Sequence, residues 1–168
     1  MNALTKTFDP AQVDNRAFRE ALGRFGTGVT VITCETGTGP LGITANSFSS
    51  LSLDPPLVMW APAKNSSRYP FFMATQRFAI HVIAQDTAEI CSAFARDGDA
   101  FDQFDWERND YGVPILNNCL SRFECVTHAT HDGGDHSIVV GRVERVTTGD
   151  GAPLLFFGGD YGGFEKTS

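Results

Sequence analysis

The sequence has few positive charges and no long apolar run. Lys and Arg number 13 against 20 Asp and Glu, which gives a formal net charge of −7. Because the nucleic-acid backbone is itself negative, this balance argues against a nucleic-acid partner. No apolar run approaches the roughly 20 residues that span a bilayer, and the first ten residues lack the apolar core of a signal peptide. We therefore expect a cytoplasmic protein with no membrane association.

Cysteine is scarce and scattered. The four cysteines, Cys34, Cys91, Cys119 and Cys125, form no C-x-x-C pair, so neither a zinc knuckle nor a redox dithiol is supported. Free cysteine packs as a small apolar side chain, and we expect buried free thiols. The one G-x-G-x-x-G, GTGPLG over 37–42, lies in a turn between two expected strands and does not open a helix. Any nicotinamide cofactor must then bind without a Rossmann fold.

The composition is that of one globular domain. The chain has 168 residues, of which 42% are hydrophobic and 20% charged. Residues 1–13 show no hydrophobic periodicity, so we expect a flexible N-terminal arm there and a single domain over 14–168.

Two segments have the pattern of amphipathic helices. The first begins with Asp14 or Asn15 as N-cap, and Phe18, Leu22 and Phe25 recur at the spacing of one buried face. The second is expected over 86–95, where an Asp and a Glu three residues apart have the spacing of a capping box.

Most of the remaining chain consists of short apolar runs separated by turn residues. Such runs, without β-α-β alternation, favour a mainly β protein, an antiparallel barrel with peripheral helices. His81 lies within one run, and its apolar neighbours predict a packed core residue. The expected strands cover 29–34, 42–53, 57–60, 78–83, 120–130, 137–147 and 154–157.

The segment 42–67, GITANSFSSLSLDPPLVMWAPAKNSS, carries two clusters of hydroxyl and amide side chains. The first lies on one face of an alternating strand, and the second precedes a short helix whose N-terminus can bind phosphate. Between them, residues 57–60 do not alternate, so we expect a strand covered on both faces. The pattern favours a ligand with a phosphate and a flat ring. The alternative is an ordinary solvent-facing strand with Ser66 as a simple N-cap.

A turn near the end of the chain reads Gly133, Gly134, Asp135, His136. Two glycines permit a close approach of the backbone, after which Asp and His are presented together at the mouth of a barrel. The alternatives to a ligand-binding role for this segment are a plain turn and a metal site. Against the metal, residues three apart in a strand face opposite sides, and no helical H-x-x-x-H pair exists. The candidate ligands are His128, His131, Asp132, Asp135 and His136.

Four sequence motifs of the chain are, in chain order, FREALGRFGTGVTVIT, TANSFSSLSLDPPLVMW, AKNSS and, near the end, GGDH. These motifs resemble those of the flavin reductase family. The likeness runs from about Phe18 to Tyr161, with the motifs in the family's order and spacing. It implies a split β-barrel of the FMN-binding type in a homodimer. It also implies an NAD(P)H:flavin oxidoreductase that reduces FMN, or FAD, and supplies the reduced flavin to a partner flavin-dependent monooxygenase.

The same resemblance implies which residues hold the two nucleotides. We expect His136 to position the nicotinamide, with Gly134, Asp135 and Tyr161 also contacting NAD(P)H. Family members often carry basic residues around this tyrosine, where the chain has FFGGDYGGF, and the lack of an arginine cluster favours NADH over NADPH. The residues expected to line the flavin are Thr44, Ala45, Asn46, Ser47, Ser50, Leu51, Lys64, Asn65, Ser66, Ser67, Phe94, Ala95 and Arg96, of which Lys64 to Ser67 meet the phosphate.

A non-catalytic flavin-binding carrier or sensor is the alternative function. Such a protein would keep the polar segment 44–67 but would not need His136, so the G-D-H triplet favours the reductase. A flavoenzyme acting on its own organic substrate would need an anchoring charge cluster near the flavin, and the sequence shows none.

Overall fold

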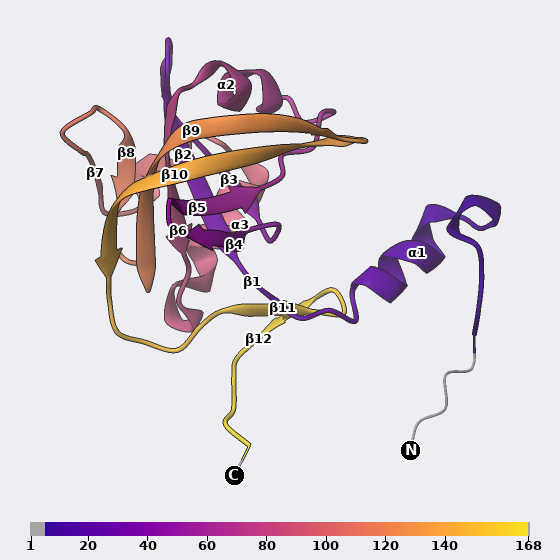
Figure 1. Cartoon of the computed structure of the whole chain (residues 1–168). Coiled ribbons are helices and arrows are strands. Elements are labelled where there is room, and N and C mark those ends of the chain that lie inside the picture. Colours follow the sequence, from indigo (N-terminus) through magenta and orange to yellow (C-terminus); the bar gives the residue numbers. More distant parts are fainter. Residues whose placement is uncertain (1–5, 168) are drawn as a thin grey trace.

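The centre of the molecule is a seven-stranded antiparallel sheet with the order β3-β2-β6-β9-β10-β5-β4 (Figure 1). The structure is a computed structural model that describes residues 6–167. Within these residues no pairing joins the edge strands β3 and β4, so the sheet does not close into a complete barrel. The mainly β prediction is confirmed. The strands are β2 (Thr30–Thr36), β3 (Gly39–Ala45), β4 (Ser49–Leu53), β5 (Pro56–Trp60), β6 (Arg77–Val82), β9 (Ser121–Gly133) and β10 (His136–Thr148).

Two small sheets complete the β structure. The first joins β1 (Thr27–Gly28), β11 (Leu155–Phe157) and β12 (Asp160–Gly162), and the second pairs β7 (Trp106–Arg108) with β8 (Pro114–Leu116). Strand β12 was not predicted, because a three-residue strand between glycines has no apolar run to reveal it. It forms because its backbone pairs antiparallel with β11.

Helix α3 (Ala88–Arg96) packs against β3 and leaves no room for a side chain at Gly42. A Cβ atom at Gly42 would lie 2.4 Å from Cδ1 of Phe94, so the glycine permits the close approach of helix and strand. The predicted capping box is wrong. The helix starts after a 3-10 turn, η2 (Gln85–Thr87), which contains Asp86, and its N-cap Thr87 makes no side-chain capping bond. The other helical segments are η1 (Pro10–Gln12), α2 (Tyr69–Ala74) and η3 (Ala100–Gln103).

Helix α1 (Asn15–Leu22) stands apart from the sheet, as Figure 1 shows. Its predicted start is confirmed, because the Asp14 side chain accepts hydrogen bonds from the backbone N–H groups of the first turn. The prediction that one face of this helix is buried is wrong for the single chain. Phe18, Leu22 and Phe25 are 41%, 57% and 78% exposed, because the helix projects beyond the elements that could cover this face.

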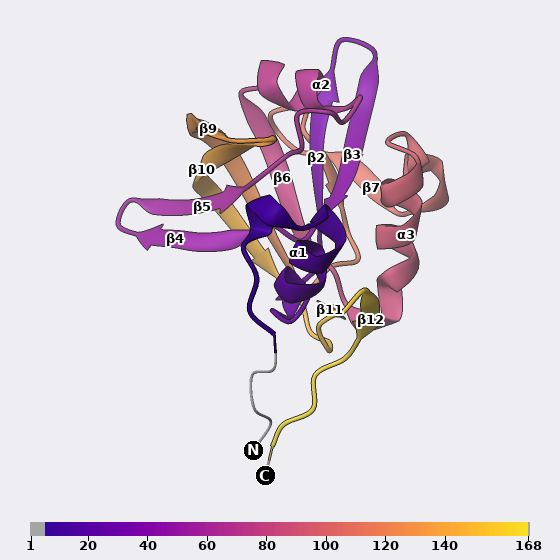
Figure 2. The same cartoon turned by 90° about the vertical axis from the view of Figure 1, so that its right-hand side faces the viewer.

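The expected strand over 42–53 is two strands. The chain leaves the sheet after Ala45, and β4 then pairs with β5 in a hairpin that projects from the body (Figure 2). The expectation that β5 is covered on both faces is also wrong, because one of its faces is only partly covered in the single chain. Val58 and Trp60 are buried, but Leu57 and Met59 are only half-buried, because β5 lies next to the edge strand β4.

His81 is fully buried in β6, as predicted. Its Nδ1 lies 2.9 Å from the carbonyl oxygen of Val31, and its Nε2 accepts a hydrogen bond of 3.0 Å from the backbone N–H of Leu116. These partners define a neutral ring with the proton on Nδ1. Burial lowers the pKa of His81 to about 4.

The cysteines are free thiols. Cys34, Cys91 and Cys125 are buried, as predicted, whereas Cys119 is half-buried. Burial raises the pKa of each of the three buried thiols to about 12.

The expected N-terminal arm lies partly outside the described residues, which begin at residue 6. Residues 6–13 include the 3-10 turn η1, whose N-cap Asp9 accepts a hydrogen bond from Ala11 N–H. Over the described range, no helix combines the length and apolarity required to cross a membrane.

Candidate functional site

Two pockets meet at the end of β3. Both are lined by Thr44, Ala45 and Asn46, three residues expected to line the flavin. The first pocket has a volume of about 290 Å³ and is completed by Val29, Phe156 and Tyr161. The second has a volume of about 190 Å³, and its other lining residues are Ile43, Ser47, Trp60, Ala61, Pro62, Ala63 and His136.

Hydrogen bonds hold the end of β3 in place. The carbonyl oxygen of Ala45 accepts a 2.7 Å bond from the Thr30 hydroxyl, and the Ser47 hydroxyl accepts a 2.9 Å bond from Ala61 N–H. The Thr44 hydroxyl donates to the carbonyl oxygen of Cys91 at 2.7 Å. The Thr44 side chain therefore fastens α3 to β3.

His136 opens β10 directly after the turn. Gly134 adopts a positive φ of 79°, as the two-glycine motif predicts. The neighbouring Ser137 N–H donates to the carbonyl oxygen of Pro62 at 3.1 Å, which brings this strand end beside residues 61–63. Nδ1 of His136 lies 2.7 Å from Oδ1 of Asp135, and this bond lowers the pKa of the Asp135 carboxyl. An ionised carboxylate can only accept, so Nδ1 donates, and Nε2 makes no hydrogen bond within residues 6–167.

Lys64 is bonded to the β9–β10 turn and does not point freely toward a phosphate. Its Nζ contacts the Asp132 carboxylate and donates to the carbonyl oxygen of Gly134 at 2.7 Å. The bond to Asp132 raises the pKa of Lys64 and lowers that of Asp132. The other residues of the expected phosphate cluster, Asn65, Ser66 and Ser67, form the turn before α2.

Arg68 belongs to this region and was missed in the sequence, although it directly follows the K-N-S-S cluster. Its Nη1 donates to the carbonyl oxygens of Gly42 at 3.2 Å and Phe94 at 2.5 Å. Burial lowers the pKa of its guanidinium. The side chain thus joins the turn before α2 to both β3 and the end of α3.

Several expected flavin residues do not line the two pockets. Ser50 and Leu51 lie on β4, where a register shift leaves Leu51 unpaired and 51% exposed. Phe94 is fully buried in the core beneath Gly42. Ala95 and Arg96 are exposed at the end of α3.

Phe156 and Trp60, which the sequence did not identify, supply part of the pocket walls together with the expected Tyr161. Phe156 packs against Tyr161 at a centroid distance of 5.5 Å, and both line the first pocket. Trp60 lines the second, and its buried Nε1 has no hydrogen-bond partner within residues 6–167. Pockets with aromatic walls on one side and short polar side chains on the other fit a flat ring with a polar edge. In the described part of the chain, no three His, Cys, Asp or Glu side chains converge as metal ligands.

Comparison with known proteins gives consistent matches along the chain. The family model described as flavin reductase like domain matches residues 22–165. The chain is 54% identical over 159 residues to the FMN reductase (NADH) SmoA of Agrobacterium fabrum, covering 95% of this chain and 91% of the relative. It is 39% identical to HsaB of Mycobacterium tuberculosis, the reductase subunit of a flavin-dependent monooxygenase, over 92% of this chain and 85% of the relative.

A solved structure of similar fold contains both kinds of nucleotide. The NADH:FAD oxidoreductase SgcE6 of Streptomyces globisporus, in complex with NAD and FAD fragments, matches with a TM-score of 0.88 and 35% identity. The match covers 96% of this chain and 98% of that one.

Proposed function

The chain belongs to the family of flavin reductase-like domains, and on this basis we propose that it is an NADH-dependent flavin reductase. It transfers a hydride from the nicotinamide to FMN and releases the reduced flavin to a partner flavin-dependent monooxygenase. The identity of 54% to an NADH-dependent FMN reductase over 95% of the chain supports the reaction and both nucleotides.

The observation that carries the proposal is the pocket that His136 shares with Thr44, Ala45, Asn46 and Ser47. Hydride transfer requires the two rings to be stacked, so the groups that bind them must open into one space. Four of the residues proposed to hold the flavin, Thr44 to Ser47, line this pocket together with His136, although His136 is about 90 positions away in the chain.

The residues have distinct proposed roles. Backbone groups of residues 44–47 hold the ring, the turn of Asn65, Ser66 and Ser67 receives the phosphate, and Tyr161 closes the side nearest β12. His136 orients the nicotinamide through Nε2, while Asp135 fixes the ring of His136. When bound, a flavin supplies N5 as the hydride acceptor. The protein has to align and shield the rings, and no general acid is required.

Stopped-flow absorbance tests the proposal. The purified protein is mixed anaerobically with FMN or FAD and NADH or NADPH in the four possible pairs, and bleaching of the visible flavin band is followed. We expect the fastest bleaching with FMN and NADH. Flavin binding without bleaching by either nicotinamide would contradict the reductase and favour the carrier or sensor function.

We propose that the protein is a homodimer in which a second copy covers the apolar face of α1. An isolated helix of eight residues is marginal in water, and this one has no buried residue within its own chain. A groove of about 530 Å³ runs beside it, lined in part by Leu22, Phe25 and Phe156. The exposed face and the groove together support a partner surface of the same chain.

The variant L22D/F25D is expected to convert the dimer to a monomer. Each substitution places a charge in an apolar contact, which costs about 2 kcal/mol or more where the residue is central to an interface. Size-exclusion chromatography with light scattering measures the mass. Arg16→Ala, on the polar face of the same helix, is the control and leaves the dimer intact. A variant that stays dimeric would place the interface elsewhere.

The proposed setting follows from the reaction. NADH and a monooxygenase partner are available in the cytoplasm, and the four unpaired thiols suit a reducing compartment. Residues 14–168 are proposed to form one catalytic domain preceded by the short N-terminal arm.

A further inference from the structure

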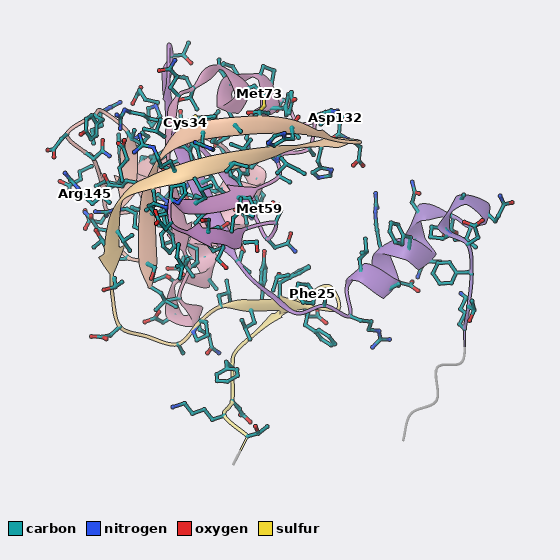
Figure 3. The ribbon with its side chains drawn as sticks, viewed as in Figure 1. Phe25, Cys34, Met59, Met73, Asp132 and Arg145 are labelled. Carbon is teal, nitrogen blue, oxygen red and sulfur yellow. The ribbon has the colours of Figure 1, made fainter. Side chains whose placement is uncertain are left out.

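The turn that carries His136 is joined to the turn before α2 by one side chain. Lys64 lies in the turn before α2, and its Nζ reaches both the Asp132 carboxylate and the carbonyl oxygen of Gly134. Asp132 and Gly134 lie on either side of Gly133, in the last residues of β9 and the turn. Figure 3 shows Asp132 at the tip of the long β9–β10 hairpin, far from Arg145 near the other end.

We propose that Lys64 and Asp132 form a positioning pair that sets the place of His136 for the nicotinamide, and that Lys64 is not a phosphate ligand. This inference rests on the proposed reductase function.

The backbone contacts explain why a side-chain link matters here. Lys64 N–H donates to the carbonyl oxygen of Asp135 at 2.9 Å, and Ser137 N–H donates to that of Pro62 at 3.1 Å. These bonds hold the chain on both sides of His136. The tip itself contains two adjacent glycines, one with a positive φ, so its own backbone is conformationally permissive. The ammonium of Lys64 restrains this tip by binding the Gly134 carbonyl and the Asp132 carboxylate together.

The bonding capacity of Lys64 argues against a phosphate role. An ammonium has three N–H donors, and two are directed at the hairpin. To meet a phosphate with the full charge, Lys64 would have to leave Asp132, whose carboxylate would then lie beside the same anion. The two functions therefore compete for one cation, and the observed geometry serves the hairpin.

The test compares Lys64→Met, Asp132→Asn, the double variant and Lys64→Arg. Titration with FMN, followed by flavin fluorescence, gives the Kd of the flavin, and steady-state oxidation of NADH gives the KM of the nicotinamide. Asp110→Asn is the matched control, because Asp110 also forms an exposed ion pair, with Arg145 at 2.9 Å.

We expect Lys64→Met to raise the KM for NADH about fivefold and Asp132→Asn about threefold, with the Kd for FMN changed less than about twofold. The KM for NADH of the double variant should be no higher than that of Lys64→Met, because the two substitutions remove the same contact. Lys64→Arg preserves the charge and should keep the KM within about twofold of the wild type. Asp110→Asn should match the wild type in both constants.

Two results would overturn the inference while wild-type protein still reduces FMN. One is a larger rise in the Kd for FMN than in the KM for NADH on Lys64→Met, which would make Lys64 a phosphate ligand. The other is an unchanged KM for NADH in Asp132→Asn. A wild-type protein that binds FMN but oxidises no NADH would instead overturn the proposed function, and this inference would fall with it.

Discussion

Replacing His136 with alanine is expected to lower kcat/KM for NADH on the order of 100-fold, because a misplacement of about 1 Å in a hydride-transfer geometry can cost that much. The flavin should bind nearly as before. The pocket wall formed by Thr44, Ala45, Asn46 and Ser47 does not depend on the imidazole, and backbone bonds hold the start of β10 in place. Anaerobic stopped-flow measures the reduction rate, and fluorescence titration measures the Kd for FMN.

His131→Ala is the matched control, since it removes an imidazole from the same hairpin. His131 is exposed on β9 opposite Ile138 and lines neither pocket at the end of β3. It should keep the wild-type rate. An equal loss of FMN binding and NADH oxidation in His136→Ala would show that this residue supports the whole pocket and has no specific role toward the nicotinamide.

Acidification is expected to destabilise the protein through His81. In the folded state its pKa is about 4, whereas in the unfolded chain it returns to about 6.5, so below pH 6.5 the unfolded state binds a proton that the folded state does not. The free energy of unfolding therefore falls as the pH drops from 6.5 toward 4. Between pH 7 and pH 5 this residue alone accounts for about 2 kcal/mol.

Urea unfolding at pH 7 and pH 5, at one fixed protein concentration, measures this loss. His81→Gln cannot titrate, so its stability should fall by about 2 kcal/mol less than that of the wild type over the same interval. It should also be less stable at pH 7, because glutamine does not reproduce both bonds of the ring. Equal acid losses in the wild type and His81→Gln would mean that the buried ring is protonated without unfolding.

The sequence predicted the elements that depend on local contacts. Asp14 caps α1 through bonds to backbone groups two and three residues away, and the hairpin at Gly133 and Gly134 forms where the glycines indicate a turn. The interactions that form this helix cap and this turn join residues close together in the sequence, so the local sequence is sufficient to predict them.

What the sequence did not predict depends on distant partners. The strand expected through 42–53 breaks after Ala45, because β4 pairs with β5 and not with β2. The exposure of Phe18 and Leu22 depends on whether another surface covers α1, which periodicity cannot report.

In the candidate site too, the sequence predicted some residues and missed those whose role depends on distant partners. The polar cluster at 44–47 and the G-D-H turn were recognised from a resemblance along the chain, and the fold brings residues 44–47 and His136 of that turn to one pocket. The partner of Lys64 was not foreseen, because Asp132 lies 68 positions away and looks like any exposed acid of a hairpin. Phe156 was missed for a related reason, since the pairing of β11 with β1 and β12 is what brings it to the pocket.

The buried thiols have a consequence for a protein that releases reduced flavin in air. Dihydroflavin reacts with oxygen to give hydrogen peroxide, which oxidises cysteine through the thiolate and not the thiol. With pKa values of about 12, Cys34, Cys91 and Cys125 are almost entirely protonated at neutral pH and sit away from solvent. The core of the protein is thereby protected from the by-product that its own reaction generates.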